Sequence, residues 1–189
     1  YLFGGVEIRW SCAPERIGNS GVPEKAVFHF PGGLKDSLAS DLQGETLITE
    51  EIFAGKTPKA SGHGAVHWAI AWSDGDGWIR SYCNTIPTAE GGTHETGLRS
   101  ALLRGLKAHA ERTGNKGGQV ITGEDVMAGC AAMLSVFIRE PEFVGQTKDK
   151  LSSAEATRIV ENALRDSFDH WLAAAPNAGH VALVDMAHA

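Results

Sequence analysis

Cysteine is scarce in this chain, and no part of it is apolar enough to span a membrane. The 189 residues include three cysteines, Cys12, Cys83 and Cys130, which are far apart and form no CxxC pair. Three scattered cysteines exclude a disulfide framework and a zinc ribbon, and they indicate reduced, buried thiols. No run approaches the roughly 20 apolar residues that a membrane-spanning helix requires. We therefore expect a cytoplasmic protein.

Basic residues are also in the minority. Lys and Arg number 17 against 23 Asp and Glu, which gives a net charge of −6. Tight DNA binding requires clustered Lys and Arg that neutralise phosphates, so this balance argues against a chain that binds nucleic acid strongly on its own. Apolar residues are plentiful, however. A content of 42% in a chain of this length is enough for the core of one large domain.

Strand patterns dominate the first 90 residues. Segments 6–10 and 25–30 are short strand-like runs, and segment 63–72 alternates with a period of two. The larger side chains of that alternating run share one face: Val66, Trp68, Ile70 and Trp72. A polar turn at 73–77 leads to a further strand at 78–86, which predicts a β-hairpin. Segment 34–42 predicts a short helix between the early strands.

Two long amphipathic helices are expected later in the chain. Apolar residues recur at intervals of three and four from Leu98 to Leu106. A second helix starts near Ser152, whose spacing to Glu155 matches a capping box, and runs to Ala175. Strands come first and long helices follow, which fits an α+β domain with helices packed on one face of a mixed sheet.

A strand followed by a polar loop is predicted between these two helices. Residues 121–133 have the pattern of a helix capped by Thr122 and Asp125, and the β-branched and aromatic run 134–139 predicts a strand. The loop after this strand carries Gln146, Thr147 and Lys148. An amide, a hydroxyl and an ammonium on one exposed tip can reach an anionic oxygen that lies outside the domain.

Two short patterns resemble ligand sites, but their context excludes both. Gly55-Lys56-Thr57 matches the end of a P-loop, yet Glu50 stands where that motif requires glycine, and Pro58 prevents the helix that would hold the phosphate. His63 and His67 are four residues apart on a predicted strand, so their Cα atoms are about 13 Å apart. Because that distance is too long for a shared ion, no metal site is predicted.

Three longer motifs resemble those of the B subunits of bacterial type IIA topoisomerases. They are EGGTHETGLR at 90–99, ITGEDV at 121–126 and PEFVGQTKDKLSS at 141–153. The resemblance covers nearly the whole chain, and the NTIPT and KLSS segments favour the topoisomerase IV branch over gyrase. It implies a ribosomal S5 domain 2-like transducer fold with a left-handed βαβ crossover. Residues 1–175 would form the transducer domain, and 176–189 would begin the helix that leads to the DNA-cleavage (TOPRIM) domain.

The resemblance also implies a role in ATP-dependent strand passage, in which one DNA duplex moves through a break in another. In the family, the lysine of the QTK loop contacts the γ-phosphate of ATP bound to the neighbouring ATPase domain, and the glutamine assists. The matching residues here are Lys148 and Gln146. ATP and Mg²⁺ would therefore be cofactors of the parent enzyme, whereas this piece alone is expected to bind neither and to be inactive.

The expected partners also follow from the resemblance. They are the ATPase and TOPRIM domains of the same polypeptide, the topoisomerase IV A subunits of an A2B2 heterotetramer, and a DNA duplex in the bacterial nucleoid. Three alternatives remain: the same domain of the gyrase B subunit, a free-standing S5-like nucleic-acid-binding module, and an independent NTPase. In the glycine-rich loop of the first motif, we expect Thr93 to cap a helix, and His94 has no assigned role.

Overall fold

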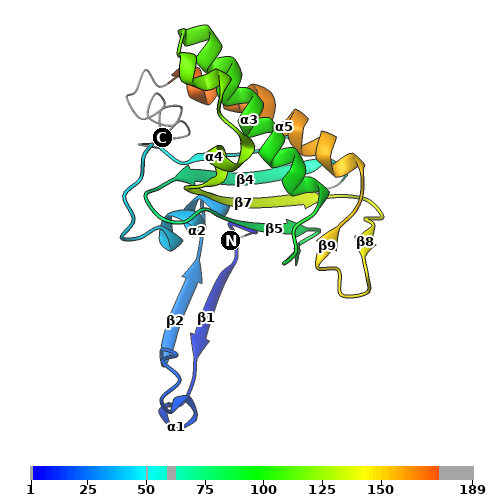
Figure 1. Ribbon diagram of the computed structural model, residues 1–189. Helices are drawn as coiled ribbons and strands as arrows, with labels where there is room; N and C mark the ends of the chain where they lie inside the picture. The colour runs from blue at the N-terminus through cyan, green and yellow to red at the C-terminus, as the bar shows by residue number, and fades with distance from the viewer. Residues whose placement is uncertain (1, 50, 59–62, 175–189) are drawn as a thin grey trace.

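A five-stranded mixed sheet forms the centre of the protein (Figure 1). The computed structural model describes residues 2–49, 51–58 and 63–174. The strands run in the order β3 (Phe53–Lys56), β4 (Ala65–Trp72), β7 (Cys130–Phe137), β5 (Trp78–Cys83) and β6 (Ile86–Pro87). β5 and β7 are parallel, and the other neighbouring strands are antiparallel. The predicted α+β class with a mixed sheet is confirmed. Segment 176–189 of the predicted domain division lies outside the described residues.

The predicted hairpin between β4 and β5 is wrong. β7 lies between them, antiparallel to β4 and parallel to β5. The turn at 73–77 crosses the start of this intervening strand, where the Ser73 and Gly77 amides donate to the Gly129 and Ala128 carbonyls. Seven of the eight residues of β7 are buried. A strand that is apolar on both faces gains most from a central position, which no local turn pattern reveals.

Two long helices, α3 (Thr93–Thr113) and α5 (Glu155–Ala174), cover one face of the sheet (Figure 1). α3 lies in the connection between β5 and β7, so these elements form the βαβ crossover. The larger side chains of β4 point to this face, as predicted. There Phe168 of α5 is fully buried, with Phe53, Trp72 and Trp171 around it.

The opposite face of the sheet is covered by a smaller element. Helix α2 (Leu34–Asp41) packs Leu34 and Leu38 against alanines of β4 and β7. Small side chains at these sheet positions let the short helix approach the sheet closely. This packing explains why the second face of β4 is rich in alanine. The two long helices therefore share one face as expected, and the structure adds α2 on the other.

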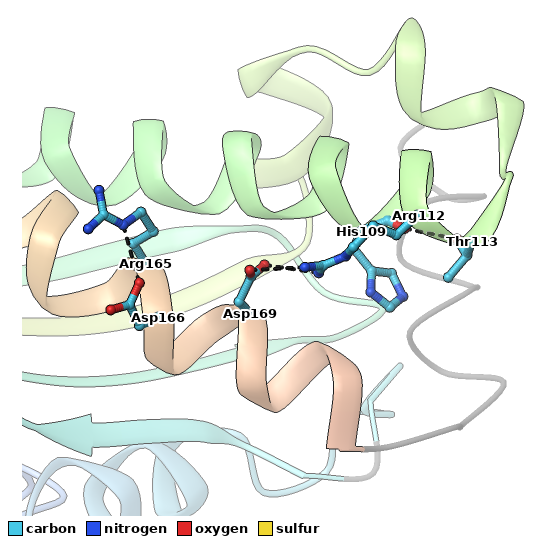
Figure 2. Close-up of polar contacts among 6 residues, drawn as sticks. All are labelled: His109, Arg112, Thr113, Arg165, Asp166 and Asp169. Atoms are coloured by element: carbon cyan, nitrogen blue, oxygen red, sulfur yellow. Dashed lines mark hydrogen bonds and ion pairs between the residues drawn. The ribbon is translucent and has the colours of Figure 1, made fainter.

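α3 and α5 are held together along their length by a close backbone approach and by ion pairs. A Cβ added at Gly97 would lie 2.4 Å from the carbonyl oxygen of Thr157, so only glycine permits this contact. Figure 2 shows the far end of the pair, where Arg112 donates to both carboxylate oxygens of Asp169 at 3.0 Å. This two-point contact joins the ends of the two helices with defined geometry, although its exposure limits its contribution to stability.

The helix predicted over 121–133 is shorter than the pattern indicated. Thr122 and Asp125 form the expected capping box, but α4 (Gly123–Met127) ends early and β7 already begins at Cys130. A one-turn 3₁₀ helix, η1 (Lys116–Gln119), precedes it. Ala-rich sequence has little intrinsic preference for strands, so the pairing of residues 130–133 with β4 and β5 overrides it.

The first strands do not belong to the central sheet. β1 (Glu7–Ser11) and β2 (Lys25–His29) form an antiparallel hairpin with α1 (Pro14–Ile17) at its tip, and it extends away from the core (Figure 1). Nine of its ten strand residues are exposed, including Ile8 and Val27 at 58% and 64%. Across residues 2–49, 51–58 and 63–174, no helix has the length and hydropathy needed to cross a bilayer.

Candidate functional site

The predicted polar loop is the tip of a small β-hairpin. Strands β8 (Phe143–Val144) and β9 (Lys150–Leu151) pair antiparallel, and the tip between them exposes Gln146, Thr147 and Lys148. Lys148 has a φ of 60°, in the left-handed region that non-glycine residues rarely adopt. The three polar side chains thus lie together on an exposed tip, as the sequence predicted. The left-handed backbone of Lys148 constrains the direction in which its side chain projects.

The base of this hairpin is fixed by the glycine-rich loop of the first motif. The Glu90 amide donates to the Asp149 carbonyl at 2.8 Å, and the Leu151 amide donates to the Gly91 carbonyl at 2.9 Å. The two bonded residues of the hairpin, Asp149 and Leu151, lie on either side of Lys150, and Asp149 directly follows Lys148. Two motifs about 50 residues apart in the sequence therefore form one structural unit.

Gly92 is the residue that makes this approach possible. Its φ is 139°, and a Cβ added there would lie 2.2 Å from the Leu151 carbonyl oxygen. Gly92 and Leu151 also form an isolated parallel bridge. A side chain at this position would force the two segments apart, so the second glycine of the motif is required by the packing of the hairpin.

The other arm of the hairpin is tied to the start of α5. The Glu142 amide donates to Ser153 Oγ at 2.8 Å, and the Ser152 amide donates to the Glu142 carbonyl at 2.8 Å. Thr93 Oγ1 donates to the Ser153 carbonyl at 2.7 Å, and Thr157 Oγ1 donates to the Thr93 carbonyl at 2.9 Å. The hairpin base is therefore bonded to α3 through Thr93, and it runs directly into the residues that precede α5.

Two predicted caps are corrected by these contacts. The N-cap of α3 is Gly92, and the side chain of its neighbour Thr93 bonds Ser153, just before α5, and not its own first turn. Helix α5 begins at Glu155, so Ser152 cannot be its N-cap in a box with Glu155. In both cases the polar group serves a contact between segments, which takes precedence over the local pattern.

A buried polar cluster lies beneath the glycine-rich loop. His94 Nε2 is 3.0 Å from Thr88 Oγ1, which is 2.6 Å from Ser81 Oγ. Ser81 Oγ donates to Glu95 Oε1 at 2.7 Å. His94 is fully buried, and among the residues that the structure describes, none bonds its Nδ1 atom. The sequence assigned His94 no role. Its position in the glycine-rich motif, two residues after Gly92, was the one feature that could have drawn attention to it.

Burial lowers the pKa of His94 to about 4, so the imidazole is neutral at physiological pH. Below pH 6.5 the unfolded chain binds a proton at this residue while the folded chain does not, and stability must fall as the pH falls toward 4. We expect the free energy of unfolding to lose about 2–3 kcal/mol from this residue between pH 7.5 and 4.5. Urea denaturation at both pH values measures the loss.

The His94→Asn variant is the control for this titration. It removes the ionisable group, so its unfolding free energy should fall by about 2–3 kcal/mol less than that of the wild type over the same pH range. Equal losses in the two proteins would show that the folded protein accepts the proton at His94 without penalty.

The remaining candidate groups are the cysteines, the Gly55-Lys56 pair and the side chains that could bind a metal. Burial raises the pKa of Cys83 to about 11 and that of Cys130 to about 12, so both remain protonated thiols. All three cysteines are free, with Cys12 only partly buried. Gly55 and Lys56 lie on strand β3 and not in the predicted surface loop. Within the described segments, no group of three His, Cys, Asp or Glu side chains could hold a metal ion.

Sequence comparison relates this chain to one enzyme family. The family model for DNA gyrase B matches residues 33–187. The DNA topoisomerase 4 B subunit of Bartonella bacilliformis is 63% identical over 178 residues, covering 94% of this chain and 26% of that protein. The Caulobacter vibrioides homologue is 55% identical, covering 93% of this chain and 26% of its own length. The DNA gyrase B subunit of Mycolicibacterium smegmatis is 36% identical, covering 87% and 24%.

Structural comparison agrees with this relation. The 43K ATPase domain of Thermus thermophilus gyrase B, solved with an aminocoumarin, superposes with a TM-score of 0.79 at 27% identity, over 99% of this chain and 48% of that one. The topoisomerase IV ATP-binding domain of Francisella tularensis, solved with a small-molecule inhibitor, gives 0.70 at 28% identity, over 98% and 48%. The chain spans about a quarter of the curated relatives and about half of these solved domains.

Proposed function

The chain belongs to the DNA gyrase B family of type II topoisomerase B subunits, and from this we propose that it is the transducer region of a topoisomerase IV B subunit. Residues 1–175 would form this region, and 176–189 would lead toward the TOPRIM domain. Its QTK loop would deliver Lys148 to the γ-phosphate of ATP in the neighbouring ATPase domain, with Gln146 assisting. The observation that carries the proposal is the polar tip, exposed at the end of a hairpin whose base is bonded to α3 and to the residues just before α5.

The chemistry of the tip suits a phosphate contact. Lys148 lies at the outer end of the hairpin, where its flexible stem can place a point charge against phosphate oxygens. The Gln146 amide can donate to the same group. The described residues include no acidic cluster for Mg²⁺, so the metal and adenine contacts would come from the rest of the parent protein. This chain would then supply one cation to an ATP site that it does not contain.

A contact with the rest of the parent protein would also account for the exposed β1–β2 hairpin. One face of its paired strands carries Ile8, Trp10 and Phe28, whose side chains are 58%, 45% and 48% exposed. Exposed apolar surface of this kind marks a contact with another element. About half of the Thermus thermophilus ATPase structure lies outside the region that this chain matches. We propose that this hairpin packs on the corresponding ATPase part of the parent protein.

Coupling would follow from rigid connections. The contact with the γ-phosphate exists only before that group is released. The hairpin base is bonded to Thr93 of α3 and to Ser153 just before α5, so movement of the tip must move both helices. The close packing of α3 on α5 at Gly97, together with the Arg112–Asp169 ion pair, would let the two helices move as one rigid body (Figure 2). In the parent enzyme, this motion would reach the DNA-cleaving partner and the DNA duplex.

Chemical protection of Lys148 tests the proposal directly. When the full-length protein binds a non-hydrolysable ATP analogue, Lys148 should be protected from acetylation, because the ammonium is then held against phosphate. Lys116, exposed in η1 and outside both hairpins, provides the internal control and should react equally with and without nucleotide. Peptide mass spectrometry measures both sites. Equal acetylation of Lys148 in both states would refute the γ-phosphate contact.

The isolated chain should not bind ATP with measurable affinity. One lysine on an exposed tip cannot replace an adenine pocket and a metal site, since small-ligand sites bury most of the ligand surface. Calorimetric titration of the 189-residue chain with Mg-ATP measures this, and the full-length protein is the positive control. Micromolar binding by the isolated chain would instead support the independent-NTPase alternative.

A further inference from the structure

The chemistry of four side chains fixes the direction of the hydrogen bonds that join them: buried Ser81, Thr88 and His94, and half-buried Glu95. A carboxylate only accepts, so Ser81 donates its single proton to Glu95 at 2.7 Å, in preference to the Thr88 carbonyl at 3.4 Å. Thr88 must then donate to Ser81, and its oxygen is left to accept from His94 Nε2. His94 is therefore the tautomer protonated at Nε2, and the four groups form one chain of donors.

This chain of bonds holds both ends of the glycine-rich loop. At one end, the Thr88 amide donates to the Ser81 carbonyl of β5, and the Thr88 carbonyl accepts from the Gly91 amide, each at 2.9 Å. At the other end, His94 and Glu95 belong to the first turn of α3. The Thr88 hydroxyl links the two ends, because it bonds both Ser81 of β5 and His94 of α3. These bonds restrict the conformation of the backbone at residues 89–92.

The fixed loop in turn holds the arm that carries Lys148. Gly91 accepts from Leu151, and Glu90 donates to Asp149, the residue that follows Lys148. We propose that Thr88 and His94 are positioning residues for Lys148, which they hold at the hairpin tip through the backbone of residues 90–92. This inference rests on the proposed function for its effect on turnover, but not for its effect on the hairpin itself.

Two substitutions at Thr88 separate its hydroxyl from its shape. Thr88→Val keeps the volume and removes the hydroxyl that joins Ser81 to His94, whereas Thr88→Ser keeps that hydroxyl. In the full-length protein, reconstituted with its partner into the whole enzyme, we expect Thr88→Val to lower kcat for ATP hydrolysis by roughly 10- to 100-fold, the scale of a small misplacement of a catalytic group. KM for ATP should change less, and Thr88→Ser should restore most of kcat.

Amide hydrogen exchange of the same full-length proteins measures how firmly the hairpin is held, independently of ATP turnover. The amides of Glu90 and Leu151 should exchange faster in Thr88→Val than in the wild type, because their bonds across the two segments open more often. They should exchange at the wild-type rate in Thr88→Ser. Ser135→Ala is the matched control, since it removes a buried hydroxyl of β7 that bonds none of the described groups.

A double variant decides whether the effect passes through Lys148. If it does, Thr88→Val should cause no further loss of kcat in a Lys148→Ala background. A full additional loss would overturn the inference, and so would wild-type exchange at Glu90 and Leu151 in Thr88→Val. Near-normal turnover of the Lys148→Ala enzyme alone is a separate result. It would refute the proposed function, while the exchange rates would still decide whether Thr88 holds the hairpin.

Discussion

Replacing Lys148 by alanine in the full-length protein should reduce ATP turnover by about 10²–10³-fold, the usual loss when one stabiliser of transition-state charge is removed. The ammonium would neutralise negative charge that shifts across phosphate oxygens during cleavage. Nucleotide affinity should fall less, because the adenine and metal contacts remain. Steady-state ATPase and strand-passage assays on the reconstituted enzyme measure the effect.

The variant should otherwise be intact. Lys148 is exposed at a loop tip, so its removal opens no cavity and should change the unfolding free energy by no more than about 0.5 kcal/mol. A thermal melt checks this. Lys150→Ala is the matched control: this exposed lysine lies two residues away on β9, and its loss should leave turnover close to normal. Normal turnover by a folded Lys148→Ala enzyme would show that the tip does not reach the nucleotide.

The neighbouring amide should matter less than the ammonium. Gln146→Ala removes a neutral donor from the same tip, and neutral hydrogen bonds are roughly half as strong as charge-assisted ones. We therefore expect a reduction in ATP turnover that is smaller than that of Lys148→Ala. The same steady-state assay gives the order of the two effects, and a larger loss at Gln146 would contradict the assignment of Lys148 as the principal contact.

Phe168→Ala should cause the largest loss of stability. The ring is fully buried between α5 and the sheet, with centroids 5.0 Å from Phe53, 6.2 Å from Trp72 and 5.9 Å from Trp171. Truncating such a residue removes its contacts and leaves a cavity, which costs about 3–5 kcal/mol. Urea denaturation of the 189-residue chain should show this as a lower midpoint with little change in slope.

Two further substitutions calibrate that value. Phe168→Leu keeps most of the volume, so it should cost less than about 1.5 kcal/mol. Val120→Ala removes an apolar side chain that is 59% exposed and should stay within about 0.5 kcal/mol of the wild type. If Phe168→Ala lowered the unfolding free energy as little as Val120→Ala, this aromatic cluster would not be what holds α5 on the sheet. The proposed rigid connection between the hairpin and the helices would then lack its support.

Local periodicity predicted the elements whose patterns are strong. The alternation of β4 placed Val66, Trp68, Ile70 and Trp72 on the core face, where the structure has them. Helical spacing located α3 and α5, whose apolar stripes face the sheet. These predictions succeed because a period of two or of about 3.6 residues is itself the geometry of a strand or a helix with one buried face.

Three of the failed predictions concern segments that depend on distant partners. The turn at 73–77 has hairpin composition, yet β7 comes between its two strands. Thr93 has the residue type of a cap, yet it bonds Ser153. Residues 130–133 have a helical pattern, yet they pair as a strand. In each case a contact made across more than 50 residues of sequence is stronger than the local preference, and no single window of sequence contains it.

The candidate site divides in the same way. The polar tip could be predicted from the residues alone, since Gln146, Thr147 and Lys148 are consecutive and lie between recognisable rigid elements. The family could be predicted too, because its three motifs are contiguous runs of residues. The clamp on the hairpin, made by residues 90 and 91 with Thr88 and His94 buried below, becomes visible only in the folded domain. Backbone hydrogen bonds between distant segments depend on how those segments pack, and side-chain identity does not encode them locally.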